Sequence, residues 1–182
     1  MSDEEIAKAH ATTPPVHNDR IHLAGYDPAW PVRFERLAGD ILAALGEVRL
    51  EHVGSTSVPG LPAKPILDML LIVEDPAGEA AYVPALESLG YVLTIREPEW
   101  YEHRVLKLTG GEMPVNLHVL PEGCLEVRRM LGFRDWLRTH DEDRDLYADT
   151  KRDLAGRTWK YVQNYADAKT RVVESILARA GV

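Results

Sequence analysis

The fold is decided by residues 52–71, HVGSTSVPGLPAKPILDMLL, in which a loop rich in glycine and hydroxyl side chains joins two strands. Before the loop, VRLEHV (48–53) alternates apolar and polar residues and stops at Gly54, which predicts a strand with one buried face. After the loop, residues 66–73 form an apolar run interrupted only by Asp68, which is typical of a central strand covered on both faces. We therefore expect two strands joined by a compact loop.

The segments on either side of this stretch predict further elements. Asp27 and Pro28 supply an N-cap and a first helical residue, and apolar residues then recur at helical spacing until Gly46, so a helix is expected there. Gly110-Gly111 predicts a tight hairpin, because paired glycines accept positive φ. In chain order, the other expected elements are a helix over 76–89, strands over 91–95, 102–108 and 115–120, and helices from 122 to the C-terminus, interrupted near 139–141 and at 156.

The order of these elements predicts an α+β fold, with a mixed sheet of about five strands flanked by helices and a C-terminal helical layer. A chain of 182 residues can bury one full-sized core, so we expect one domain over residues 21–182. Residues 1–20 contain an acidic start, a Thr-Thr-Pro-Pro turn and little periodicity, and are expected to form a mobile N-terminal arm.

The composition restricts the classes of partner and the location. With 21 Lys+Arg against 29 Asp+Glu, the net charge is −8, so extensive nucleic-acid binding is not expected, whereas a compact phosphate pocket is compatible with it. No apolar run approaches the roughly 18–20 residues of a membrane helix, so we expect no membrane span. A single cysteine, Cys124, and an N-terminus without an apolar signal core predict a cytoplasmic location.

The loop and the strand after it carry the candidate chemistry. Gly54, Ser55 and Thr56 offer hydroxyls and approachable backbone amides, the composition of a phosphate nest, and Lys64 could add a cation. Asp68 lies within an apolar strand, where a carboxylate is costly unless it is hydrogen-bonded, paired or bound to metal. The residues alone leave two interpretations open: a phosphate site, or an ordinary tight loop with Asp68 capping a neighbouring turn.

Together with YDPAWPVRF (26–34) and VNLHV (115–119), the stretch HVGSTSVPGLPAKPILDMLL resembles the GrpB family, a group within the nucleotidyltransferase superfamily. The resemblance covers the chain from Tyr26 to the last helix. It implies a nucleotidyltransferase-like mixed sheet and a Gly-Ser pair after a strand. It also implies an Asp-x-Asp pair on the next strand, which holds a nucleoside triphosphate through two metal ions, and a third carboxylate from a neighbouring strand.

This sequence matches that pattern only in part. Gly54 and Ser55 occupy the Gly-Ser positions. Asp68 aligns best with the second acid, which puts Ile66 where the first should stand; if Asp68 is instead the first acid, Leu70 replaces the second. His118 occupies the position expected for the third acid. A carboxylate is missing in either alignment, so a standard two-magnesium site is not expected to be complete.

Asp68, His118 and His52 are the candidate metal ligands. The expected divalent metal is Mg or Mn, with Zn or Ni as the alternative, because imidazole is an acceptable ligand for zinc, manganese and nickel. The alternative is that both histidines are hydrogen-bonded structural residues, which is the more frequent role of a lone histidine in a strand.

Further cations come from one strand and from the last helical region. Strand alternation places Arg104 and Lys107 on opposite faces, so both cannot enter one pocket from a regular strand. Either could bind phosphate, and GrpB-like chains carry basic residues on the strand before VNLHV; the alternative is an exposed hairpin with surface charges. Lys169 occupies a GrpB-like position in YADAK (165–169).

Two functional hypotheses follow. The first is a nucleotidyltransferase-like protein that binds a nucleotide or another phosphorylated small molecule and transfers a nucleotidyl group with a divalent metal. Its catalytic candidates are Asp68 and Ser55, and its phosphate-binding candidates are Gly54, Ser55, Thr56, Lys64, Arg104, Lys107 and Lys169. The second is a catalytically degenerate binding module, for example one linked to coenzyme A metabolism, because GrpB-like domains are also fused to dephospho-coenzyme A kinases. A purely structural interaction domain would explain neither the Gly-Ser loop nor the acid in an apolar strand.

Overall fold

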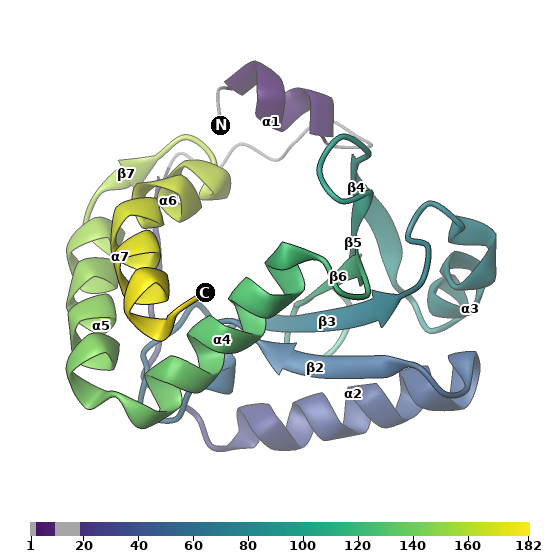
Figure 1. Ribbon diagram of the computed structural model, residues 1–182, viewed down its shortest axis with the longest axis horizontal. Coiled ribbons are helices and arrows are strands. Elements are labelled where there is room, and N and C mark those ends of the chain that lie inside the picture. Colours follow the sequence, from purple (N-terminus) through teal and green to yellow (C-terminus); the bar gives the residue numbers. More distant parts are fainter. Residues whose placement is uncertain (1–2, 10–18) are drawn as a thin grey trace.

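A five-stranded mixed sheet forms the centre of the molecule in the computed structural model, which describes residues 3–9 and 19–182. The strand order is β2-β3-β6-β5-β4; β3 and β6 are parallel, and the other neighbours are antiparallel. The strands are β2 (Arg49–Val53), β3 (Leu67–Val73), β4 (Val92–Glu97), β5 (His103–Leu108) and β6 (Val115–Pro121). Helices cover both faces (Figure 1), so the predicted α+β class is confirmed.

The helices follow the predicted order, with three local differences. They are α1 (Asp3–Ala9), α2 (Ala29–Leu45), α3 (Val83–Ser88), α4 (Leu125–Thr139), α5 (Asp141–Ala155), α6 (Val162–Ala168) and α7 (Thr170–Ala180), with 3₁₀ turns at Ser55–Ser57 and Glu79–Ala81. The helix predicted over 76–89 is only the second of these turns followed by the short α3. The C-terminal region, predicted to be helical throughout, also contains β7 (Thr158–Trp159), which pairs with β1 (Asp19–Arg20).

The third difference concerns the predicted N-terminal arm. Residues 1–2 and 10–18 lie outside the described residues, but Asp3–Ala9 forms a helix whose Ile6 is 1% exposed. Nothing in the composition of this segment indicated a buried apolar anchor. Over the ranges that are described, no helix combines the length and the apolar character needed to cross a membrane.

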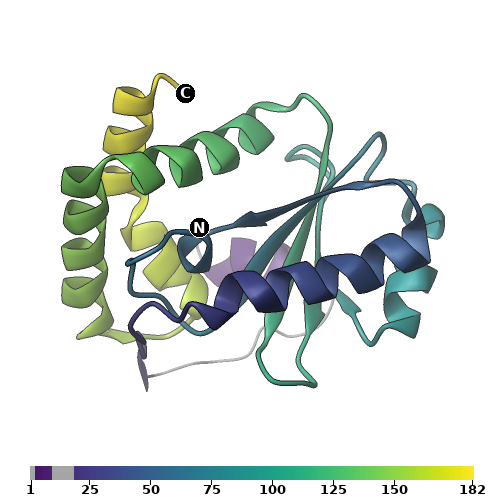
Figure 2. The same cartoon turned by 90° about the horizontal axis from the view of Figure 1, so that it is seen from below.

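One face of the sheet packs on α2 and α3 (Figure 2). The carboxylate of Asp27 accepts the backbone N–H of Ala29 at 2.8 Å and so satisfies one of the free donors at the start of α2. Trp30 and Ile41 of α2 then lie against Met69 and Leu71 of β3. This face is therefore a closed apolar core.

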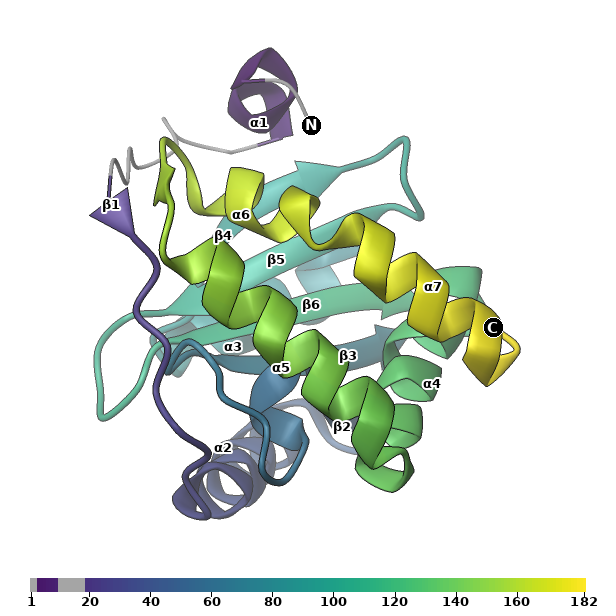
Figure 3. The same cartoon turned by 90° about the vertical axis from the view of Figure 1, so that its left-hand side faces the viewer.

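The opposite face is covered in two different ways. Near β2, Val127 of α4 packs directly on Leu70 and Ile72. Farther along, α5, α6 and α7 pass in front of the strands (Figure 3). The residues that follow the Ser55–Ser57 turn are buried among α4, α5 and α7. Val58 and Leu61 belong to this apolar cluster. The loop is thus held between the sheet and the helical layer.

A glycine is required where the loop begins. Gly54 has φ +69° and ψ −171°, and a Cβ at this position would lie 2.6 Å from Asp68 Oδ2. Its carbonyl accepts a hydrogen bond from Ser57 Oγ at 2.6 Å, which fixes this conformation. The absence of a side chain therefore allows the loop to approach Asp68 closely.

We predict that Gly54→Ala destabilises the protein by about 1–3 kcal/mol, because alanine meets both an unfavourable backbone conformation and the Asp68 carboxylate. The matched control is Gly110→Ala, since a Cβ at Gly110 has nothing within 4 Å. Urea unfolding of the two variants and the wild type measures the difference. Equal stability of the two variants would show that the close approach of Gly54 to Asp68 has no energetic importance.

Candidate functional site

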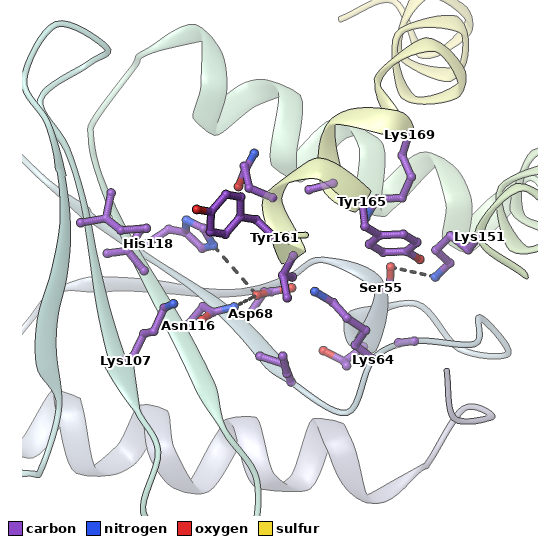
Figure 4. A pocket seen from close by; sticks show the side chains of 18 of the residues that line it. Ser55, Lys64, Asp68, Lys107, Asn116, His118, Lys151, Tyr161, Tyr165 and Lys169 are labelled. Carbon is purple, nitrogen blue, oxygen red and sulfur yellow. Dashed lines mark hydrogen bonds and ion pairs between the residues drawn. The ribbon is translucent and has the colours of Figure 1, made fainter. Parts of the chain in front are cut away.

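A cavity of about 370 Å³ lies between the open part of the sheet and α5 and α6. Its floor comes from β3, β5 and β6, one side from the Ser55–Ser57 turn and the loop after it, and its roof from the C-terminal helices (Figure 4). The lining thus combines elements that are more than 100 residues apart in sequence.

The floor is a row of polar side chains fixed by strand register. Asp68 on β3 pairs with Asn116 on β6, which in turn pairs with Lys107 on β5, so all three side chains leave the same face of the sheet. Asn116 Nδ2 donates to Asp68 Oδ1 at 2.9 Å. In the next row, His118 lies on the same face, with Nε2 4.0 Å from Asp68 Oδ1. The carboxylate of Asp68 is therefore held by its neighbours and faces the cavity.

The cavity collects most of the lysines of the chain. Of six lysines in the sequence, four line it: Lys64, Lys107, Lys151 and Lys169. The amines of Lys64 and Lys169 lie 5.7 and 4.5 Å from the centre of the Tyr165 ring. Against these four amines the described lining offers a single carboxylate, Asp68. The site therefore has the electrostatic character of an anion pocket.

Burial makes the amines unusually easy to deprotonate. It lowers the pKa of Lys64 to about 8 and the pKa of Lys151 to about 6, while the charge of Asp68 acts in the opposite direction on both. Burial also lowers the pKa of Lys107 and of Lys169. A bound anion would favour the charged amines, so the pocket and a negatively charged ligand are complementary.

Most of the residues predicted from sequence do meet here. Ser55, Thr56, Lys64, Asp68, Lys107, His118 and Lys169 all line the cavity, and Gly54 touches Asp68 from the adjacent position. Their roles in phosphate binding and catalysis remain predictions.

His52 does not belong to this site, contrary to the expectation that it joins a metal centre. It pairs with Met69, so its side chain leaves the opposite face of the sheet from Asp68. There its ring stacks on Phe34, and Nε2 lies 2.9 Å from Thr56 Oγ1. Burial lowers the pKa of His52 to about 4. His52 is a structural residue that ties α2 to the loop.

Arg104 is also outside the cavity, contrary to the expectation that it joins the other phosphate-binding candidates. Because side chains alternate along β5, Lys107 faces the cavity and Arg104 leaves the opposite face of the sheet, where α3 packs. There Arg104 Nε donates to Glu79 Oε1 at 2.6 Å, and Nη1 donates to the Glu102 carbonyl at 2.7 Å. Its guanidinium is already engaged in an ion pair that anchors the turn before α3.

The donor set does not fit a two-metal centre. Among residues 3–9 and 19–182, no group of three or more histidine, cysteine or acidic side chains lies close enough to hold a metal ion. Asp68 and His118 form only a pair, and the surrounding lysines disfavour a second cation. We therefore derive no reaction step through a metal.

Lys151 is the site residue that the sequence did not identify. It is 1% exposed, and its amine lies 2.9 Å from Ser55 Oγ and also donates to the Pro62 carbonyl. A signal for it existed: on α5 it shares the spacing of the buried residues Tyr147, Ala148, Leu154 and Ala155. A lysine within the apolar stripe of an amphipathic helix indicates a buried, paired amine.

We predict a pH-dependent stability that arises from Lys151. Its amine is neutral in the folded protein above a pH of about 6, but in the unfolded chain it stays charged up to its ordinary pKa of about 10.4. Between these values the unfolded chain binds more protons, so stability rises with pH. Urea unfolding between about pH 6 and pH 9 should show a smaller rise for Lys151→Met than for the wild type.

The matched control is Lys160→Met, because Lys160 is exposed and does not line the cavity. This variant should keep the pH dependence of the wild type. An identical rise in all three proteins would contradict a neutral Lys151.

Comparisons with known proteins agree with this architecture. The UPF0157 protein BH1888 of Halalkalibacterium halodurans is 52% identical over 181 residues, which is 98% of this chain and 92% of that protein. A dephospho-CoA kinase of Mycolicibacterium paratuberculosis is 27% identical over 175 residues, covering 82% of this chain but only 43% of the kinase. The crystal structure of the conserved protein GrpB from Enterococcus faecalis has a TM-score of 0.73 at 30% identity, covering 87% of this chain and 96% of that chain.

The family model described as GrpB protein matches residues 20–179, which is nearly the whole chain. The matched region contains the glycine-serine loop, Asp68, His118 and the lysines of the cavity. In agreement with the resemblance of its sequence motifs, the chain belongs to the GrpB family.

Proposed function

We propose that this protein binds a nucleotide or another phosphorylated small molecule in the lysine-lined cavity, and that binding needs no divalent metal. The observation that carries the proposal is the convergence of four of the six lysines on one cavity in a chain whose net charge is −8. Clustered amines are costly to bury together, and a phosphate group offsets that cost. Ser55 Oγ lies 2.9 Å from the Lys151 amine, so its hydroxyl adds a polar group beside these amines.

A metal-dependent nucleotidyl transfer is the second candidate. Its support is Asp68, a strand carboxylate that is directed into the cavity next to His118. The first proposal is favoured because positive charge is already supplied by side chains, whereas metal ligands are few.

The similarity to part of a dephospho-CoA kinase suggests which phosphorylated ligands to test. That enzyme is matched over less than half of its length, which fits a role for the GrpB-like segment as an accessory module. Coenzyme A and its precursor carry several phosphate groups, so they belong among the ligands to be tested.

The first test is calorimetric titration with pyrophosphate, ATP and coenzyme A, in EDTA and in Mg²⁺ or Mn²⁺. We predict binding in EDTA. The variants Lys64→Gln and Lys169→Gln should each weaken it by about tenfold or more, because a hydrogen bond to a charged group contributes about 1.5–3 kcal/mol. Lys160→Gln is the matched control and should bind as the wild type does. Binding that appears only with a metal ion, or none with any of the three ligands, would overturn the proposal.

Substitution of Asp68 separates the two candidate functions. Asp68→Asn keeps an oxygen that can accept the Asn116 hydrogen bond, but removes a negative charge from the cavity. Metal-independent binding predicts that pyrophosphate affinity in EDTA is retained or raised, because the repulsion between two anions is removed. Metal-dependent binding predicts a large loss of affinity in Mg²⁺. Titration of wild type and variant in both buffers distinguishes these outcomes.

A further inference from the structure

A row of hydrogen-bonded side chains runs from β4 over β5 to β6 and ends at the cavity. Glu97 Oε2 lies 2.7 Å from His103 Nδ1, and His103 Nε2 lies 3.0 Å from His118 Nδ1. The other nitrogen of His118, Nε2, is 4.0 Å from Asp68 Oδ1, which is beyond hydrogen-bond distance. Both nitrogens of His103 are therefore engaged, whereas Nε2 of His118 is directed towards Asp68 (Figure 4).

The sheet holds this row in place. Glu97 on β4 pairs directly with His103 on β5, and His118 on β6 pairs with Val105, two residues further along β5. The two imidazole rings are stacked at 5.3 Å with an interplanar angle of 11°, and the Trp100 and His103 rings form a T-shaped pair with centroids 5.1 Å apart. His103 is only 5% exposed. Rotation of either ring would break these contacts.

The carboxylate at the outer end determines the direction of the hydrogen bonds. A carboxylate only accepts, so His103 Nδ1 carries the hydrogen. In a neutral ring, His103 Nε2 then has the lone pair and accepts the hydrogen of His118 Nδ1. His118 Nε2 is left with a lone pair.

Two hydrogen-bond acceptors consequently face one another at the floor of the cavity. They are His118 Nε2 and Asp68 Oδ1, 4.0 Å apart. The other charged groups that act on the two rings are Glu97, Lys107 and Glu126. Asn116 Nδ2 already donates to Asp68 Oδ1, but the described residues place no donor on His118 Nε2. A group that donates hydrogen bonds fits between the two acceptors.

We propose that His118 Nε2 is a hydrogen-bond acceptor that recognises an O–H or N–H group of the ligand, and that His103 and Glu97 position it in this tautomer. The ligand would then carry a phosphate, for the lysines, together with either a hydroxyl, which donates one hydrogen bond to His118, or an amine or second hydroxyl, which also donates to Asp68. Sugar phosphates and nucleotides have this combination. The ligand assignment rests on the proposed function, whereas the tautomer does not.

The first test reads the tautomer directly, without a ligand. Long-range ¹H–¹⁵N correlation spectra in EDTA at about pH 8, above the ordinary imidazole pKa of about 6.5, should show a protonated Nδ1 and an unprotonated Nε2 for His118. The spectrum of His118→Gln identifies its signals among those of the seven histidines. A proton on Nε2 would overturn the proposal.

The role of Glu97 is tested by reversing its hydrogen-bonding character. The ammonium of Glu97→Lys can only donate, so His103 and then His118 should change to the opposite tautomer. Glu99→Lys makes the same charge change on an exposed residue of the same hairpin and should leave the His118 signals unchanged. An unchanged tautomer in folded Glu97→Lys would remove Glu97 from the proposal. If this variant does not fold, the wild-type spectrum still decides the tautomer.

A third test compares the binding of glycerol 3-phosphate with that of propyl phosphate, which has a three-carbon chain without the two free hydroxyls. The wild type should bind glycerol 3-phosphate about three- to tenfold more tightly, as expected for one or two added hydrogen bonds, and Glu97→Lys should lose this preference. If neither phosphate binds, and pyrophosphate, ATP and coenzyme A do not bind either, the proposed function fails; if only those three bind, the sugar-phosphate assignment fails. Equal binding of both by the wild type contradicts the His118 subsite alone.

Discussion

The parallel pairing of β3 with β6 is the constraint on which the candidate site depends. It joins two segments that are about 50 residues apart and places Asp68 opposite Asn116, with His118 in the following row. A shift of register by one residue between the two strands would turn either Asp68, or Asn116 together with His118, into the apolar core against α2. The buried residues of both strands, such as Met69 and Leu117, prevent that shift because they cannot face the polar cavity without cost. Burial of the apolar side chains on one face of the sheet thus determines that the polar side chains of β3 and β6 face the cavity.

The protein divides its cationic side chains between two roles. Arginines hold the framework: Arg134 donates to Glu51 and to the His52 carbonyl, and Arg138 donates to the carbonyl of Ser57. A guanidinium stays charged in proteins, and its planar, forked set of donors suits fixed contacts with carboxylates and carbonyls. The lysines instead gather at the cavity, where an amine can lose its charge when burial requires it and regain it beside an anion. The lining of the cavity is therefore rich in basic side chains, although the net charge of the whole protein is −8.

Strand alternation predicted much of this arrangement, because it depends on neighbours in the sequence. It separated Arg104 from Lys107, and it could also have excluded His52, which shares a face with the apolar Leu50. The contact of Lys151 with Ser55 and the stacking of His103 on His118 could not be predicted in this way. Both depend on how the helical layer or a neighbouring strand is placed, and that placement is set by packing between distant parts of the chain. The two-residue pairing of β1 with β7 has the same character.

The cavity is shared between two parts of the chain that are made at different times. The strands of its floor are complete at β6, whereas Lys151 and Tyr165 lie on α5 and α6, and Lys169 lies between α6 and α7. A ligand that contacts both the strands and the C-terminal helices would act as a reversible cross-link between the sheet and the helical layer. Its departure would loosen α6 before any strand separates, because α6 is short and lies at the roof. In the proposed function, ligand occupancy would therefore be coupled to the local opening of α6, the short helix at the roof of the cavity.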